Sequence, residues 1–124
     1  KKRFLNFLNI KKENEEIIIE KRIKDDIWKN LYQFPSFETK KENNSIMKVE
    51  KIAMKYNKLA KSRIKKWNLK PIKSILSHQE LLVTFWLINM DKKVLKKFNY
   101  YRLKKYPMPV VLDNFINKFF NIKS

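Results

Sequence analysis

The residues best suited to chemistry in this sequence are a serine–histidine pair and three glutamates. Ser77 and His78 stand between two apolar runs, and a hydroxyl beside an imidazole can both donate and accept hydrogen bonds. Glu38, Glu42 and Glu50 lie near the start of a predicted helix, and carboxylates on one helical face could hold Mg²⁺. Lysines on that helix would repel a divalent cation and attract phosphate oxygens. The serine–histidine pair is by itself typical of a polar turn.

The composition excludes several kinds of active site. The chain has no cysteine and no glycine, and His78 is its one histidine. Without cysteine there is no disulfide, no cysteine-ligated zinc and no iron–sulfur cluster within these residues. Without glycine there is no nucleophile elbow, no Walker loop and no dinucleotide fingerprint. Catalysis by any of the familiar phosphate-cradling loops is therefore excluded, and we expect no metal site and no cofactor in this chain.

The charge balance indicates an anionic partner. The 124 residues contain 30 Lys and Arg against 12 Asp and Glu, a formal net charge of +18, and a polyanion is the first partner that such a charge suggests. Most of the basic residues are lysines, and isoleucine and asparagine are abundant, which is typical of an AT-rich coding sequence. Part of the excess therefore reflects codon bias and a solvated surface. The apolar runs are far shorter than the roughly 20 residues of a membrane span.

Alternating apolar residues predict two strands at the start of the chain. One covers Phe4–Ile10 and the other Glu16–Arg22, which contains three consecutive isoleucines. The polar link Lys11–Glu15 would join them as an antiparallel hairpin, with its turn at Asn14.

An aromatic loop and a helix are expected next. Large rings in Lys24–Pro35 are typical of a loop pinned to the core, and Asn30 is the candidate for a left-handed residue. Helical periodicity follows over Ser45–Lys61, capped by Asn44 or Ser45. A stripe of lysines on this helix is either a solvated face or a phosphate-contacting one; it comprises Lys48, Lys51, Lys55 and Lys58.

The second half of the chain predicts more strands and a final helix. Strands are expected over Ile72–Leu76 and Leu81–Ile88, and the latter is apolar on both faces, as a central strand is. Asp91–Lys97 is a charged turn or short helix, and Phe98–Leu103 an edge strand. The helix Val110–Phe120 carries a core-facing stripe of Leu112, Phe115, Ile116 and Phe119. Together these elements predict one α+β domain over residues 1–124, with helices packed on a mixed sheet.

Three motifs follow one another in an order that resembles a known family. They are Ile17–Arg22 followed by Ile27–Pro35, then Leu76-Ser77-His78 with the strand after it, and Tyr106–Pro109 before the last helix. In this order they resemble the C-terminal domain of adenine DNA glycosylases of the MutY type. The resemblance implies a Nudix-like α/β/α sandwich that lacks pyrophosphohydrolase activity.

The resemblance also implies a role and partners. In the family, this domain helps to recognise 8-oxoguanine mispaired with adenine, and an N-terminal helical domain with an iron–sulfur cluster removes the adenine in base-excision repair. The chain would then be the non-catalytic part of a longer enzyme. Its expected partners are double-stranded DNA with 8-oxoguanine:adenine mispairs and that catalytic domain, with no membrane contact. A monomer in a bacterial cytoplasm is expected, associated with the nucleoid through DNA.

The residues that would contact DNA follow from the same resemblance. The lesion contact falls on Ser77, flanked by Leu76, which replaces the usual Phe, and by His78. Oxidation at C8 makes guanine N7 a hydrogen-bond donor and adds an acceptor oxygen, and a hydroxyl can pair with either. Lys70 and Lys73, near this loop, are the candidates for contact with backbone phosphates.

Two other functions remain open from the sequence. A generic basic protein that binds nucleic acid or the ribosome would need only the charge and the scattered aromatic residues. An active Nudix pyrophosphohydrolase would need a Gly-led helix with an Arg-Glu-x-x-Glu-Glu core, and residues 37–66 contain no such sequence.

Overall fold

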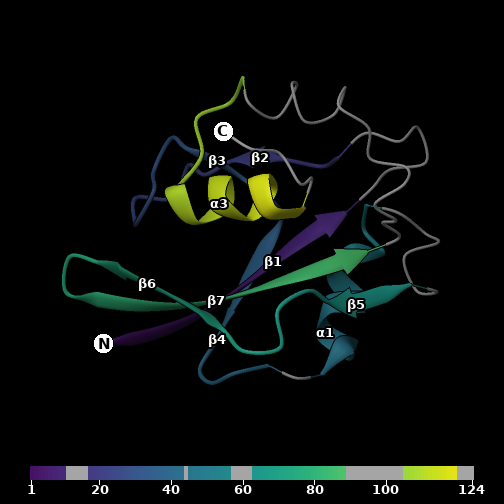
Figure 1. The fold of residues 1–124 in the computed structure, drawn as a ribbon. Coiled ribbons are helices and arrows are strands. Elements are labelled where there is room, and N and C mark those ends of the chain that lie inside the picture. Colours follow the sequence, from purple (N-terminus) through teal and green to yellow (C-terminus); the bar gives the residue numbers. More distant parts are fainter. Residues whose placement is uncertain (11–16, 44, 57–62, 89–104, 120–124) are drawn as a thin grey trace.

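The computed structural model describes residues 1–10, 17–43, 45–56, 63–88 and 105–119 (Figure 1). Within these residues the elements are, in chain order, β1 (Lys2–Ile10), β2 (Glu20–Lys21), β3 (Tyr32–Gln33), β4 (Ser36–Thr39), α1 (Ile46–Ala53), β5 (Ile64–Lys66), β6 (Ile72–Leu76), β7 (Gln79–Ile88) and α3 (Val110–Phe119).

The main sheet is mixed, as expected. Its strand order is β4-β1-β7-β5, and β6 also pairs with β7. The long central strands β1 and β7 run parallel, with Arg3 opposite Leu81 and Ile10 opposite Ile88, while β4, β5 and β6 pair antiparallel to their neighbours. Between β5 and β6 the side chain of Asn68 bonds to the backbone of β7 in the place of a neighbouring strand. Its Oδ1 accepts from the Phe85 amide at 2.8 Å. The prediction that the second apolar run lies in mid-sheet is confirmed.

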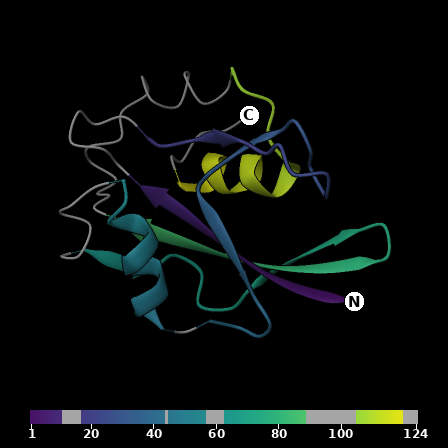
Figure 2. The ribbon, with the colours of Figure 1, turned by 180° about the vertical axis from the view of Figure 1, so that it is seen from behind.

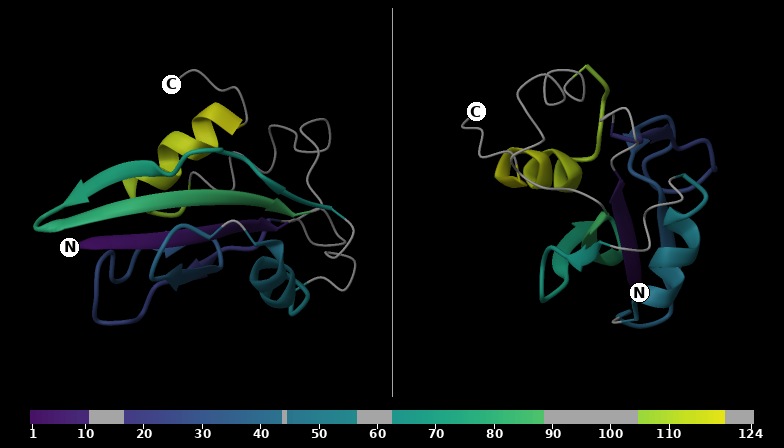
Figure 3. Two further views of the ribbon diagram at one scale, coloured as in Figure 1. Left: turned by 90° about the horizontal axis from the view of Figure 1, so that it is seen from below. Right: turned by 90° about the vertical axis from the view of Figure 1, so that its right-hand side faces the viewer.

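In the described part of the chain, one helix packs on each face of the sheet. Leu5, Phe7 and Phe85 belong to the cluster that packs under α3, and Leu8 and Trp86 to the cluster that packs under α1. The right-hand view of Figure 3 shows the two helices on opposite sides of the strands. The predicted α+β fold, an α/β/α sandwich, is confirmed.

Both described helices begin where the sequence predicts. In α3 the predicted apolar stripe is buried, and the Phe115 ring stacks on Phe85 with centroids 4.1 Å apart. In α1 the Ser45 hydroxyl accepts from the Met47 amide at 3.3 Å, so Ser45 is the N-cap. The helix ends at Ala53 rather than at the predicted residue 61, followed by i−3 hydrogen bonds that tighten a last turn. Residues 57–61 lie outside the described residues.

The predicted hairpin of the first two strands is wrong. β1 pairs with β4 and β7, whereas Glu20–Lys21 of the expected partner form β2 and pair with β3. A single backbone hydrogen bond, from the Ile18 amide to the Ile10 carbonyl at 3.1 Å, joins this segment to the end of β1. A strand that is apolar on both faces gains most in the centre of the sheet, beside another such strand. Glu20 and Lys21 in β2 are exposed and polar, so β2 gains nothing from a central position in the sheet. The link at 11–15, the predicted turn or helix at 91–97 and the predicted strand at 98–103 lie outside the described residues.

The aromatic loop is pinned to the core, as predicted. Ile27 and Phe34 are buried, and the Trp28 ring lies 6.3 Å from that of Phe7. Asn30 is left-handed with φ 71°, which confirms that prediction, and Trp28 is left-handed as well with φ 57°. The pairing of Tyr32–Gln33 with β2 adds a short strand where only a loop was expected.

Two buried asparagines on β1 generate a prediction about stability. The carboxamide of Asn9 is fully buried, and neither of its polar atoms has a partner in the structure as described. That of Asn6, on the opposite face, accepts from Trp86 Nε1 at 3.1 Å. Because an unpaired buried polar group is costly, Asn9→Leu should raise the free energy of unfolding by about 1–3 kcal/mol. Asn6→Leu should lower it, and a loss of stability in both variants on urea denaturation would contradict the prediction.

Candidate nucleic-acid interface

Ser77 and His78 form the tip of a tight β-hairpin. Leu76 pairs with Gln79, so these two residues alone connect β6 to β7. Of the two, Ser77 has a positive φ, 57°, in the region of backbone conformation that glycine usually supplies. A residue with a Cβ pays about 1–2 kcal/mol there. The turn projects from one end of the sheet (Figure 1), and both of its residues are exposed.

The three residues assigned to the lesion contact have different surroundings. Leu76 is half-buried and packs against the cluster under α3. Ser77 and His78 are open to solvent. The structure therefore assigns Leu76 to anchoring the hairpin and leaves the hydroxyl and the imidazole accessible to a partner.

The two lysines expected to contact phosphate also differ. Lys70 is exposed, and its carbonyl accepts from Asn68 Nδ2 at 2.9 Å. Lys73 Nζ lies 2.7 Å from Glu80 Oε1. The hydrogen bond from Lys73 lowers the pKa of Glu80, and the nearby charge of Lys2 lowers it further. Glu80 and Lys2 face each other across β1 and β7, and nothing in the sequence marks them, because a parallel pairing of distant segments leaves no local pattern.

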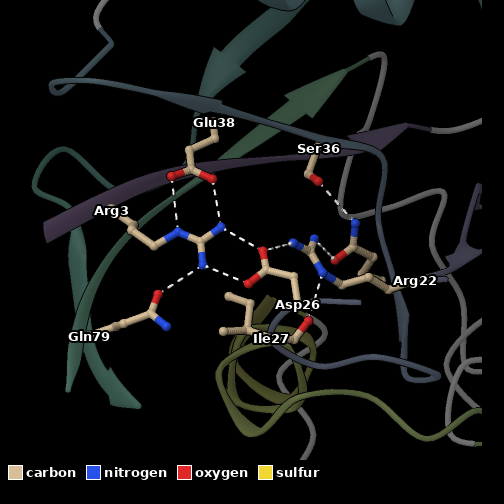
Figure 4. Close-up of polar contacts among 8 residues, drawn as sticks. Arg3, Arg22, Asp26, Ile27, Ser36, Glu38 and Gln79 are labelled. Atoms are coloured by element: carbon tan, nitrogen blue, oxygen red, sulfur yellow. Dashed lines mark hydrogen bonds and ion pairs between the residues drawn. The ribbon is translucent and has the colours of Figure 1, made fainter. Parts of the chain in front are cut away.

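A buried arginine network underlies the turn (Figure 4). Arg3 is 8% exposed, and its five N–H groups all donate. Nε and Nη2 donate to the two carboxylate oxygens of Glu38 at 3.0 and 2.8 Å, and Nη2 and Nη1 donate to those of Asp26 at 2.8 and 3.2 Å. Nη1 also donates to Gln79 Oε1 at 2.9 Å. One guanidinium therefore joins β1 to β4, to the aromatic loop and to the base of the hairpin.

A second guanidinium extends the network into the aromatic loop. Arg22 Nε donates to the carbonyl of Ile27 at 2.8 Å, Nη1 to Gln33 Oε1 at 3.2 Å, and Nη2 to Asp26 Oδ2 at 3.3 Å. Gln33 in turn donates to the Ser36 hydroxyl at 3.0 Å. These bonds connect both ends of the loop that contains the two left-handed residues.

The two carboxylates of this network are held ionised. The hydrogen bonds from Arg3 keep the pKa of Asp26 well below its usual 3.8 and lower that of Glu38 from its usual 4.5. The same bonds raise the pKa of Arg3. This network was not predicted from the sequence, although the scarcity of arginine among the basic residues was a signal for it. The chain has few arginines among many lysines, and a forked donor suits bidentate carboxylate contact as lysine does not.

The three glutamates considered for Mg²⁺ have separate surroundings. Glu38 binds Arg3, Glu42 Oε2 lies 3.5 Å from Lys66 Nζ, and Glu50 lies on α1. In the part of the chain that the structure describes, no three His, Asp or Glu side chains are grouped as a metal site would require.

The lysine stripe of α1 lies away from the turn. Lys51 and Lys55 are exposed, and Lys48 Nζ lies 5.1 Å from the centre of the Phe37 ring; Lys58 is outside the described residues. Figure 2 shows α1 and the β6–β7 turn at opposite ends of the sheet. The stripe and the turn are therefore separate surfaces.

The mixed sheet between α1 and α3 is consistent with a Nudix-like α+β fold, and the family follows from the sequence. The model described as NUDIX domain matches residues 6–118, and the chain belongs to this family. No curated protein matches the chain. None of the helices in the described ranges is long and apolar enough to cross a membrane.

The arginine network predicts a dependence of stability on pH. Asp26 and Glu38 have lower pKa values in the folded chain than when unfolded, so the unfolded chain binds more protons as the pH falls below about 4.5. Their stabilisation is complete above that pH and is lost progressively below it. Asp26→Asn should cost about 2 kcal/mol at pH 7 and make the acid-induced loss shallower.

The measurement is urea unfolding between pH 7 and pH 2. Asp25→Asn is the matched control, because that carboxylate is almost fully exposed and lies 3.7 Å from Lys29. An acid dependence as steep in Asp26→Asn as in the unaltered chain would show that the network does not govern acid stability.

Proposed function

We propose that this chain is the 8-oxoguanine-recognition domain of a MutY-type adenine DNA glycosylase and that it does not itself catalyse a reaction. The observation that carries the proposal is Ser77, an exposed hydroxyl held by a left-handed backbone at the tip of a two-residue turn. The ordered resemblance of three motifs and the Nudix fold support the same conclusion.

Ser77 has the hydrogen-bonding capacity that this lesion requires. In 8-oxoguanine, N7 carries a hydrogen and C8 carries an oxygen. The hydroxyl of Ser77 accepts from N7–H or donates to O8. Unmodified guanine in the same place leaves a polar group unpaired, at a cost of about 1–3 kcal/mol. His78, the exposed neighbour in the same two-residue turn, is the second residue that we propose to contact this nucleotide.

The proposed role extends to the rest of the enzyme. Lys70 and Lys73 contact backbone phosphates, which contributes affinity that falls with salt and little sequence preference. An N-terminal helical domain that carries an iron–sulfur cluster removes the mispaired adenine. The whole acts as a monomer on double-stranded DNA in a bacterial cytoplasm.

The direct test is a titration of this chain with duplexes containing 8-oxoguanine:adenine, guanine:adenine or guanine:cytosine at two salt concentrations. We expect tighter binding to the lesion duplex at both salts, by about 5- to 150-fold, since one unpaired polar group costs about 1–3 kcal/mol. Ser77→Ala should remove most of this preference and leave binding to undamaged DNA unchanged.

Ser77→Gly separates the hydroxyl from the backbone. It should relieve the left-handed strain and stabilise the fold, yet lose the preference as Ser77→Ala does. Equal, salt-sensitive binding to all three duplexes would instead favour a generic basic nucleic-acid-binding protein. Hydrolysis of a nucleoside diphosphate derivative with Mg²⁺ would favour an active Nudix pyrophosphohydrolase.

Glu80 generates a second prediction about DNA. Its carboxylate holds Lys73 at 2.7 Å and repels nearby phosphates. Glu80→Gln should therefore increase the affinity for every duplex several-fold and steepen the salt dependence by about one counterion. Glu42→Gln, which breaks the ion pair with Lys66 on the α1 side, is the matched control. Unchanged affinity in Glu80→Gln would exclude the base of the hairpin from the phosphate contact.

A further inference from the structure

The base of the Ser77 turn is tied to a fixed point in the core. Gln79 faces Leu76 as the pair that closes the turn, and its Oε1 accepts from Arg3 Nη1 at 2.9 Å. Arg3 cannot move freely, because the carboxylates of Glu38 and Asp26 hold its other donors. Figure 4 shows Gln79 reaching this guanidinium from the hairpin.

The turn needs such an anchor. A two-residue turn at the end of a hairpin has few tertiary contacts, and its conformation is strained when the first residue is not glycine. Ser77 is that residue here, with φ 57°. Strained backbone persists where the surrounding structure over-determines it. The bond to Gln79 is the side-chain contact that connects the closing pair to the buried network.

We propose that Gln79, fixed by Arg3, is a positioning residue that holds the Ser77 turn in one conformation. The proposal rests on the recognition role given to Ser77, because its consequence is that the hydroxyl meets the lesion in one orientation. Gln79 itself touches no nucleotide. It acts by limiting the motion of the serine two residues before it.

The local geometry allows the tether to be removed without dismantling the network. In Gln79→Leu the Nη1 group of Arg3 keeps its hydrogen bond to Asp26 Oδ1 at 3.2 Å, and both carboxylate partners of Arg3 remain. Thermal unfolding should therefore show a folded domain. Gln79→Glu retains an acceptor for the same N–H and serves as the rescue.

Gln33→Leu is the matched control. Gln33 is buried in the same network, where it accepts from Arg22 and donates to Ser36. The substitution is chemically the same as Gln79→Leu, and it removes hydrogen bonds that have no direct path to the turn. A merely structural role of the network would make the two variants alike.

The first readout is ¹⁵N relaxation of the Ser77 and His78 amides in the DNA-free chain. Gln79→Leu should lower their order parameters from about 0.85 to below about 0.6, whereas Gln79→Glu and Gln33→Leu should leave them unchanged. The second readout is the preference for 8-oxoguanine:adenine over guanine:cytosine duplexes. It should fall about fivefold in Gln79→Leu alone, the value of one hydrogen bond.

The two readouts separate the two proposals. Unchanged order parameters in Gln79→Leu, or an equal loss in Gln33→Leu, would overturn the positioning role. A loosened turn in Gln79→Leu, combined with no lesion preference in the unaltered chain or with an undiminished preference in Ser77→Ala, would support the positioning role and overturn the recognition role of Ser77.

Discussion

The buried guanidinium of Arg3 is the interaction on which this end of the molecule depends. It satisfies two carboxylates and one carboxamide from segments separated by up to 76 positions in the sequence. A guanidinium can do this because its donors form a rigid planar fork. Removing it would leave Glu38 without the guanidinium that it binds and Asp26 with Arg22 alone, so the aromatic loop, β4 and the hairpin would lose their common attachment at once.

Local sequence patterns were sufficient for the elements that bury much apolar surface. β7, α3 and the start of α1 carry their periodicity in consecutive residues, and Ser45 and Asn30 act through their own backbone neighbours. β4 and β5 are short and partly polar, so their strand character comes from pairing with β1 and β7. The partners of β1 could not be predicted for the same reason, because the gain from central burial depends on β7, where the residue opposite each residue of β1 lies 78 positions later in the sequence.

In the candidate site, too, the features that depend on local sequence could be predicted and those that depend on strand pairing could not. The turn at Ser77 and the nearby lysines could be located from residue type and motif order. The ion pair of Lys73 with Glu80, the anchoring of Leu76 and the tether of Gln79 could not, because each depends on which strands lie side by side. The helix α1 shows that the chemistry of a surface can be predicted from residue types alone. It packs on the sheet through Val49 and Ala53, while the residues on its outer stripe are lysines, which suit anions rather than metal cations.

The complete lack of glycine has a consequence for what the surface of this domain displays. Left-handed backbone is usually supplied by glycine, which leaves the apex of a turn bare. Here the described left-handed positions are filled by Trp28, Asn30 and Ser77, so each of these bends carries a side chain at its apex. One is an aromatic ring that packs on the core, one is an amide, and one is a hydroxyl facing solvent. The absence of glycine, which excludes phosphate-cradling loops, thus also places a side chain with its own packing or hydrogen-bonding capacity at each of these bends.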